Sequence, residues 1–197
     1  ELLDSEYVDE LHRSQLHPYA QHIEFREGEW YWVVNCLNEE TATRIIRDTL
    51  LGINAVHIKS KDICVPIVGK EYRELQQKEL LRVFYESGSS RYIRVHFITP
   101  TAFKQRGNYL FYPDIRCMYQ SLMNKYDAAV REESMVDEDT LEQLCDNSSI
   151  ICYDIKSAGF SMGGVSIPSF IGKITLKLSG TQTMADFANL LFSFGEY

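Results

Sequence analysis

The chain has 197 residues, of which 45% are hydrophobic and 12% aromatic, and its formal net charge is −8. This composition is typical of a folded globular protein and excludes a disordered chain, which would carry fewer apolar and aromatic residues. No apolar run approaches the roughly 20 residues that span a bilayer, and the negative charge argues against a general nucleic-acid binder, although net charge does not show where the charges lie.

The cysteines lack the spacing of a disulfide or zinc framework. They number five, an odd count, and no two of them form a Cys-x-x-Cys pair. The pattern therefore predicts reduced, mostly buried thiols in a cytosolic protein. These residues are Cys36, Cys64, Cys117, Cys145 and Cys152.

Residues 1–13 are predicted to form an amphipathic helix that ends before His17. The apolar residues of this segment recur at helical spacing. Pro18 biases the residue before it away from helical dihedral angles, so the helix has to stop there. The apolar stripe consists of Leu2, Leu3, Tyr7, Val8 and Leu11.

Strands and one helix make up the rest of the first half. Apolar and polar residues alternate around Ile23 and Phe25, and Gly28 then turns the chain into the aromatic and β-branched run "EWYWVVNCL". Asn38 is a suitable N-cap for a helix that has Gly52 just past its end. Short strands are expected at "INAVHI" and "DICVPIV".

Residues 70–90 carry a mixed pattern. The run "EYRELQQKELLRVFYES" begins like a helix and ends like a short strand, and "SGSS" has the composition of a linker. The sequence therefore places a boundary here, between a domain over residues 1–88 and a domain over 89–197.

The second half repeats the alternation of strands and helices. The run "RYIRVHFI" has the two-residue period of a strand. Residues 114–127 carry apolar side chains at helical spacing. A further helix is expected within 131–149, strands at "IICYDIK" and "SFIGKITLKLS", and a last helix over 182–194.

Two strands of this half are predicted to have one buried and one exposed face, because their apolar residues alternate with polar ones. The apolar positions are Ile93, Val95, Phe97, Ile174, Leu176 and Leu178, and the exposed ones are Tyr92, Arg94, His96, Lys173, Thr175 and Lys177.

Each half has the order of a β-α-β-β-α-β unit with one strand missing. The prediction is an α+β protein with two tandem ferredoxin-like domains, the first lacking its opening strand and the second its closing strand. The alternative, one irregular α+β domain, explains the repeated order less simply.

Three segments resemble one known family in the right chain order. "ELHRSQLHPYAQHI" (10–23) resembles its Leu-His element after the first helix, and "HFITPTAFKQRGNYLFYPDIRCMYQSLMNKYD" (96–127) the start of its second domain. "SFIGKITLKLSGTQTMADFANLLFSFGEY" resembles its closing segment up to a glycine-rich loop. The family is the Cas-six CRISPR repeat-processing endoribonucleases of the RAMP superfamily, whose domains are RAMP/RRM-like.

The resemblance implies a cytosolic, metal-independent endoribonuclease without a cofactor. Such enzymes cut precursor CRISPR RNA once per repeat, by attack of a 2′-hydroxyl on the adjacent phosphate, and leave a 2′,3′-cyclic phosphate and a 5′-hydroxyl. The implied partner is CRISPR repeat RNA, lying across the face between the two domains. Subunits of an effector complex and a second copy of the chain are further candidate partners.

Transesterification needs a base for the 2′-proton, an acid for the leaving oxygen and positive charge near the phosphate, and an imidazole can serve as acid or base near neutral pH. The resemblance places His12 at the Leu-His position as the first catalytic candidate, with the choice between base and acid open. His17 lies about where many relatives have lysine or arginine, so it is a second proton carrier or a stabiliser of phosphate charge. A zinc site from these residues and His22 is disfavoured, because a spacing of five places no pair on one helical face.

Candidate RNA contacts cluster around the first strand of the second domain and the Thr-Pro-Thr loop. Cations interleaved with aromatic residues suit phosphates and unstacked bases. The plainer alternative is a solvated strand face, which is preferred for Arg91 taken alone. The candidates are Arg91, Arg94, Lys104 and Arg106, with Lys173 as a weaker one.

Two other functions compete with the endoribonuclease. One is a non-catalytic RNA-binding subunit of a CRISPR effector complex, built on the same tandem fold. The other is an interaction module without an RNA role, for which the acidic balance of the chain is the best argument.

Overall fold

The computed structural model describes residues 3–14, 16–76, 78–79, 81–82, 88–130, 137–162 and 164–197. Its contacts divide the chain into two compact units. Unit 1 comprises Glu1–Leu75, Ala128–Val130 and Tyr197, and unit 2 comprises Gln76–Asp127 and Arg131–Glu196. The expected domain boundary between residues 88 and 89 stays a prediction.

Helix α1 (Ser5–Arg13) opens unit 1, as its apolar stripe predicts. The Asp4 carboxylate accepts a hydrogen bond from the backbone N–H of Glu6 and caps the helix at its start. Ser14 has extended backbone angles and ends the helix, so the prediction that it stops before His17 is confirmed.

A hairpin follows, formed by β1 (Tyr19–Arg26) and β2 (Glu29–Cys36). Its two turn residues, Glu27 and Gly28, both have positive φ angles, of 53° and 88°. This is the geometry of a two-residue turn that matches the twist of the flanking strands.

The second helical segment begins as α2 (Glu39–Thr41) and continues as η1 (Ala42–Leu50), a π-helix. The Asn38 side chain accepts a hydrogen bond of 2.9 Å from the backbone N–H of Thr41, which confirms the predicted N-cap. The π-helical geometry was not expected, because the apolar spacing of η1 suits an ordinary α-helix equally well.

The core of unit 1 is small. Its buried apolar side chains in the described residues are Tyr7 and Leu11 of α1 and Ile45 of η1. Partly buried neighbours from the hairpin and both helices pack against them: Leu3, Tyr19, Val34, Cys36, Ile46 and Leu50.

A second hairpin, β3 (Ala55–Ile58) with β4 (Ile63–Pro66), is not hydrogen-bonded to β1–β2 within the described residues. In a ferredoxin-like unit the opening strand lies in the middle of the sheet, between the third and fourth strands. A unit without that strand therefore shows two separate pieces, as unit 1 does. The predicted α+β class and ferredoxin-like organisation are confirmed.

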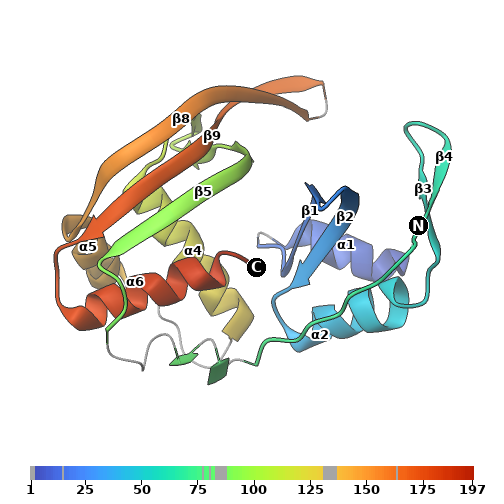
Figure 1. The fold of residues 1–197 in the computed structure, drawn as a ribbon, viewed down its shortest axis with the longest axis horizontal. Coiled ribbons are helices and arrows are strands. Elements are labelled where there is room, and N and C mark those ends of the chain that lie inside the picture. The colour runs from blue at the N-terminus through green and yellow to red at the C-terminus, as the bar shows by residue number, and fades with distance from the viewer. Residues whose placement is uncertain are drawn as a thin grey trace. The chain divides into compact units, whose positions relative to one another are not determined.

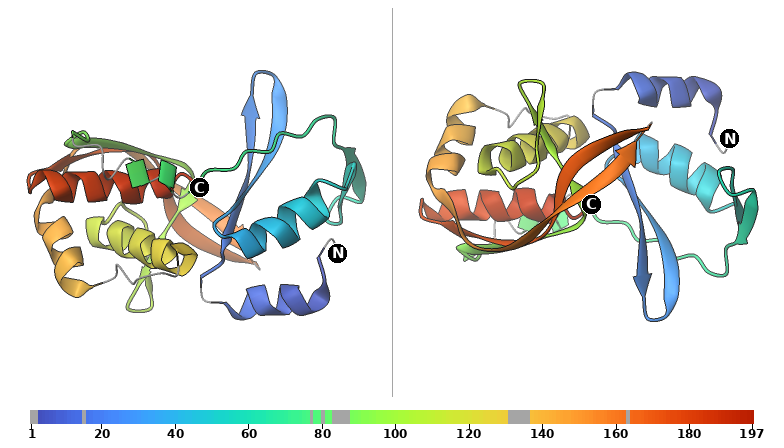
Figure 2. Two further views of the ribbon diagram at one scale, coloured as in Figure 1. Left: turned by 90° about the horizontal axis from the view of Figure 1, so that it is seen from below. Right: turned by 90° about the horizontal axis from the view of Figure 1, so that it is seen from above.

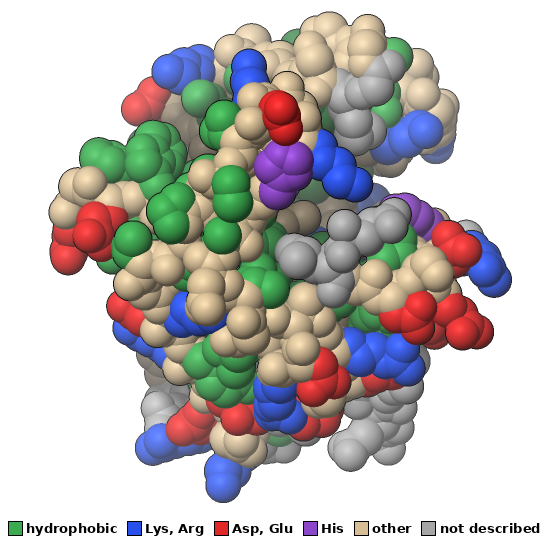
Figure 3. Space-filling view, turned by 90° about the vertical axis from the view of Figure 1, so that its right-hand side faces the viewer, with side chains coloured by type: hydrophobic (Ala, Val, Ile, Leu, Met, Phe, Trp, Pro, Cys, Tyr) green, Lys and Arg blue, Asp and Glu red, His purple; other side chains and the backbone are tan. Residues whose placement is uncertain are grey.

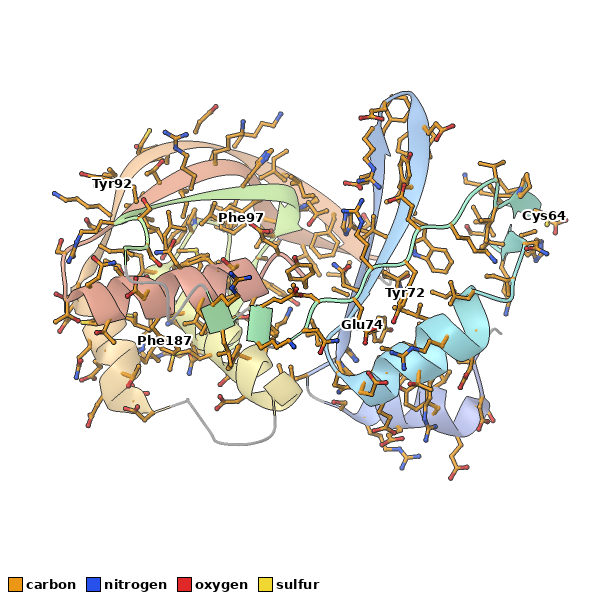
Figure 4. All side chains as sticks on the ribbon, turned by 60° about the horizontal axis from the view of Figure 1, so that its bottom comes forward. Cys64, Tyr72, Glu74, Tyr92, Phe97 and Phe187 are labelled. Atoms are coloured by element: carbon orange, nitrogen blue, oxygen red, sulfur yellow. The ribbon has the colours of Figure 1, made fainter. Side chains whose placement is uncertain are left out.

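The helix expected at the start of the run 71–87 is wrong for residues 71–76, which have no regular secondary structure. Tertiary contacts hold this segment against η1 instead. Arg47 donates to Glu39 at 2.5 Å and to Glu74 at 3.2 Å, and the Lys70 ammonium donates to the Leu51 carbonyl. Figure 4 labels Tyr72 and Glu74 on this extended segment. The short strand expected at the end of the run falls on residues 83–87, outside the described residues.

Unit 2 is built on an antiparallel sheet with the order β5-β9-β8. Its strands are β5 (Tyr92–Thr101), β8 (Ser148–Met162) and β9 (Val165–Leu178). Its helices are α4 (Ile115–Val130), α5 (Glu138–Asp146) and α6 (Gln182–Phe194). Helices α4 and α6 lie beneath the sheet (Figure 1) and side by side when seen from below (Figure 2).

The predicted faces of this sheet are confirmed. Ile93 of β5 and Ile174, Leu176 and Leu178 of β9 are at most 7% exposed, and they point toward the helices. Edge-to-face aromatic contacts join α4 to α6, one between Tyr119 and Phe192 and another between Tyr126 and Phe194. The polar positions of β5 and β9 face away from the helices and stay accessible.

The five cysteines are unpaired, but the expectation that most of them are buried is wrong. Cys64 and Cys152 are exposed, and the other three are half-buried. Cys64 lies in the isolated β3–β4 hairpin, and Cys152 lies beside a register shift in the edge strand β8. Neither position has a second layer to cover it. No helix in the described part of the chain is long and apolar enough to cross a membrane.

The cysteines are predicted to differ in reactivity. Burial raises the pKa of both the Cys36 and the Cys117 thiol to about 11. Since only the thiolate reacts, iodoacetamide at pH 8 should alkylate these two more than about tenfold more slowly than the exposed Cys64 and Cys152. The alkylation rates of Cys36 and Cys117 should rise with pH until these thiols ionise. Peptide mass spectrometry measures the rates.

Unfolding the chain in denaturant supplies the control, because it removes the burial and should bring all five alkylation rates together. Equal rates in the folded chain at pH 8 would contradict the prediction.

Candidate functional site

His12 lies in the last turn of α1 and is exposed to solvent. It follows Leu11, whose side chain points into the core, and the rotation of about 100° between successive helical residues carries His12 off the buried stripe. Within the described residues the His12 side chain makes no hydrogen bond or ion pair, so its imidazole is available to a ligand. The space-filling view shows histidine side chains at the molecular surface (Figure 3).

Tyr7 holds the helix that carries His12. Its side chain is 5% exposed, and its hydroxyl donates to Thr41 Oγ1 at 3.3 Å. The Arg44 guanidinium lies 4.5 Å from the centroid of the Tyr7 ring. These contacts join α1 to α2 and η1, and so fix the position of His12 relative to the core of unit 1.

His17 is exposed on the segment that joins α1 to β1. Its ring lies 6.0 Å from that of Tyr19, at a tilted angle of 53°. Between the two histidines, the Ser14 hydroxyl donates to the Leu16 carbonyl at 2.7 Å. The two catalytic candidates from the sequence therefore lie at the end of α1 and on the segment that follows it in unit 1.

His22 has a different environment. Its ring lies 3.8 Å from the Glu24 carboxylate on the same face of β1. Among the described residues, no group of three histidine, cysteine or acidic side chains could hold a metal ion.

Arg94 and Lys173 lie on the outer face of the unit 2 sheet. In the register of β5 with β9, Arg94 is opposite Thr175 and His96 is opposite Lys173. Tyr92, at the start of β5, belongs to the same face, whereas Phe97 turns inward onto Phe170 (Figure 4). This face combines cations with an exposed aromatic ring, as the sequence indicated.

Lys104 and Arg106 lie on a small hairpin of unit 2, formed by β6 (Phe103–Gln105) and β7 (Asn108–Leu110). The Lys104 ammonium lies 5.9 Å from the centroid of the Tyr109 ring. Arg106 and Gly107 form the turn, with positive φ angles of 49° and 82°. The hairpin presents both cations and the Tyr109 ring to solvent.

Arg91 is already engaged within the protein. Its guanidinium donates to the Gly180 carbonyl at 2.6 Å and to the Leu178 carbonyl at 3.4 Å. These bonds tie the start of β5 to the connection between β9 and α6. Its contact with RNA stays a prediction.

A hollow of about 390 Å³ lies on the outer face of the sheet, and the sequence did not indicate it. Asp154 and Lys156 of β8 contribute to it, although neither residue has a recognisable motif around it. Only the pairing of β8 with β9 places them beside the candidate Lys173. Its lining residues are His96, Phe97, Ile98, Asp154, Lys156, Ile171, Gly172 and Lys173.

Comparisons with known proteins by family model and by sequence give the same family name. The family model of CRISPR-associated endoribonuclease Cas6 matches residues 95–197. The chain is 36% identical over 198 residues to a Streptococcus thermophilus protein of that name, with 100% of this chain and 80% of the relative covered. It is 30% identical over 201 residues to a Mycobacterium tuberculosis protein of the same name, again with 100% of this chain covered but 63% of the relative.

Solved structures share the fold. A structure described as a Cas6 product complex has a TM-score of 0.79 and 21% identity, and the match covers 98% of this chain and 80% of that one. A Thermus thermophilus Cas6 structure has a TM-score of 0.66 and 16% identity, with 96% of this chain and 76% of that one covered. A third structure is described as a Cas6 substrate-mimic complex, with a TM-score of 0.73 and 20% identity over 96% of this chain and 80% of that one.

Arg91 and Arg94 are predicted to differ in their effect on stability. Replacing Arg91 with alanine leaves two carbonyls without their charged donor and should lower the free energy of unfolding by about 1–3 kcal/mol. Replacing the exposed Arg94 should change it by less than about 0.5 kcal/mol. Urea denaturation of both variants measures the difference, and equal effects would show that the Arg91 contacts do not stabilise unit 2.

Proposed function

Because the chain belongs to the Cas6 family of CRISPR-associated endoribonucleases, we propose that it cuts precursor CRISPR RNA within the repeats by attack of a ribose 2′-hydroxyl. The relatives named above support the substrate class, since their names give the CRISPR association and the endoribonuclease activity. The observation in this chain that carries the proposal is the free, exposed imidazole of His12 at the end of α1.

The reaction balances without any external reactant. A base removes the proton of the 2′-hydroxyl, the O2′–P bond forms, and the P–O5′ bond breaks. An acid then delivers a proton to the leaving 5′-oxygen. The products are a 2′,3′-cyclic phosphate and a 5′-hydroxyl, and DNA is not a substrate because it lacks the attacking oxygen.

His12 moves one of these two protons. An imidazole exchanges protons near neutral pH and can therefore act on either oxygen. Three features support this role: the ring is exposed, it has no competing partner in the described residues, and Tyr7 joins α1 to Thr41 of α2 by a hydrogen bond. Both assignments, as base for O2′ or as acid for O5′, agree with this geometry.

His17, on the segment between α1 and β1, is the second catalytic candidate. When protonated, it adds positive charge next to the phosphate, and when neutral it can accept a proton. The Tyr19 ring is its aromatic neighbour, with the ring centroids 6.0 Å apart. We assign it either the remaining proton transfer or stabilisation of the charge on the phosphorus-centred transition state.

Binding of the repeat RNA is assigned to the cations of unit 2. Arg94 and Lys173 lie on the outer face of the sheet, and Lys104 and Arg106 lie on the β6–β7 hairpin beside Tyr109. Cations beside exposed aromatic rings suit a phosphate chain with unstacked bases. Arg91 remains the fifth candidate, and its bonds to two carbonyls leave it less free to contact RNA.

A cytoplasmic setting is part of the proposal, and the five unpaired cysteines support it. Association with effector-complex subunits and pairing with a second copy of the chain stay predictions.

Cleavage of cognate repeat RNA in the presence of EDTA tests the proposed function. The wild-type chain should cut the RNA, since the proposed chemistry needs no metal ion. The His12→Ala variant should cut about a hundredfold to ten-thousandfold more slowly, because one general acid or base is lost. Gel electrophoresis of end-labelled repeat RNA measures both rates.

His57→Ala is the matched control, since His57 is another exposed histidine of unit 1 and its ring bonds Asp62 in the β3–β4 hairpin. It should cut like the wild type. If the repeat RNA stays intact with the wild-type chain yet binds tightly, the chain is a non-catalytic RNA-binding subunit, and equal cutting by His12→Ala would remove His12 from the mechanism.

A further inference from the structure

The hollow on the outer face of the unit 2 sheet brings together side chains from all three strands. The register places His96 of β5, Lys173 of β9 and Asp154 of β8 in one row across the sheet. Ile171 of β9 and Lys156 of β8 are opposite each other in the next row. The hollow is therefore built by the sheet itself and depends on no loop.

Gly172 shapes the floor of this hollow. Its φ angle is +129°, and a Cβ atom at this position would lie 2.2 Å from the Asp154 carbonyl oxygen. No other residue type allows β8 to approach β9 so closely there. The pairing of β5 with β9 is also interrupted after Phe97, so the sheet bends at the hollow.

The hollow is lined by polar side chains, most of them charged, and by apolar side chains. Lys156 and Lys173 carry positive charge, Asp154 carries negative charge, and His96 lies in the same row as Lys173 and Asp154. Within the described residues none of these four forms a hydrogen bond or ion pair through its side chain. Ile98 is 59% exposed and, together with Ile171, supplies an apolar surface.

This combination matches the parts of a nucleotide. Two ammonium groups suit phosphate oxygens, and an apolar wall with an imidazole suits the face of a base. An ionised carboxylate accepts hydrogen bonds but cannot donate them, so it selects base edges that donate hydrogen bonds. Guanine offers two neighbouring N–H donors on its Watson–Crick edge, whereas uracil has a carbonyl oxygen on each side of its single N–H.

We infer that the hollow binds one unpaired nucleotide of the RNA, that Asp154 selects guanine over uracil, and that Lys156 and Lys173 hold the neighbouring phosphates. The volume of about 390 Å³ lies within the usual range of small-ligand sites. The inference rests on the proposed function for the identity of the ligand as RNA, but it concerns sequence preference and not cleavage.

The experiment measures the binding of short single-stranded RNA to the 197-residue chain by fluorescence anisotropy. The probes are a uridine heptamer and heptamers with a single central guanosine, cytidine or adenosine. The guanosine heptamer should bind about tenfold more tightly than the uridine heptamer. Asp154→Ala should bring these two affinities together, without weakening the uridine heptamer.

Lys173→Ala should weaken all four heptamers alike and reduce the salt dependence of binding by roughly the contribution of one phosphate contact. Glu142→Ala, which removes an exposed carboxylate of α5 that does not line the hollow, is the control and should keep the guanosine preference.

Equal binding of all four heptamers by the wild type, or no binding of any, would overturn the inference, as would a guanosine preference that survives Asp154→Ala. Cleavage of repeat RNA is assayed separately on the same proteins. A chain that prefers guanosine but does not cut refutes the proposed function alone, and a chain that cuts without the preference refutes the nucleotide site alone.

Discussion

The apolar side of β9 is the constraint on which unit 2 depends. Ile174, Leu176 and Leu178 are at most 5% exposed, and β9 pairs with both other strands of the sheet. Because side chains alternate along a strand, fixing these residues against the helices fixes Lys173, Thr175 and Lys177 on the outer face. A shift of one residue in the pairing would exchange the two faces and bury the lysines. The position of the basic side chains therefore follows directly from the packing of the core.

Unit 1 carries its candidate catalytic residue on an amphipathic helix. Tyr7 and Leu11 are four residues apart, lie on one face of α1 and point into the core, whereas His12 is exposed. The Tyr7 hydroxyl bonds Thr41, which adds a polar contact that fixes the helix more specifically than apolar packing alone. A tyrosine close to a candidate catalytic histidine invites a role in proton transfer, but its burial and its bond to Thr41 explain it as a positioning residue.

Much of the fold was predictable because local signals and tertiary packing agree. The stripe of α1, the Asn38 cap and the two faces of β5 and β9 were all readable from residue spacing. The extended segment before the second unit was not, because Arg47 and Lys70 hold it through contacts that have no local signature. The exposure of Cys64 was missed for a related reason, since its apolar neighbours do not reveal that β4 lacks a covering layer.

The candidate site was only partly predictable. His12 and His17 were indicated by a resemblance to a family motif, and no spacing rule would have selected them alone. The hollow on the outer face of the unit 2 sheet was not predictable at all, because Asp154 and Lys156 meet Lys173 only through strand pairing, and Gly172 has a role that only its φ angle reveals.

In the proposed mechanism the RNA supplies its own nucleophile, and the protein moves protons and holds positive charge around it. A repeat RNA with a single 2′-deoxynucleotide on the 5′ side of the cut tests this directly, since the substitution removes one oxygen and leaves the rest of the RNA unchanged. The account predicts no cleavage at that position, and a 2′,3′-cyclic phosphate in mass spectra of the unmodified product. Cleavage of the deoxy-substituted RNA at the same bond would contradict it.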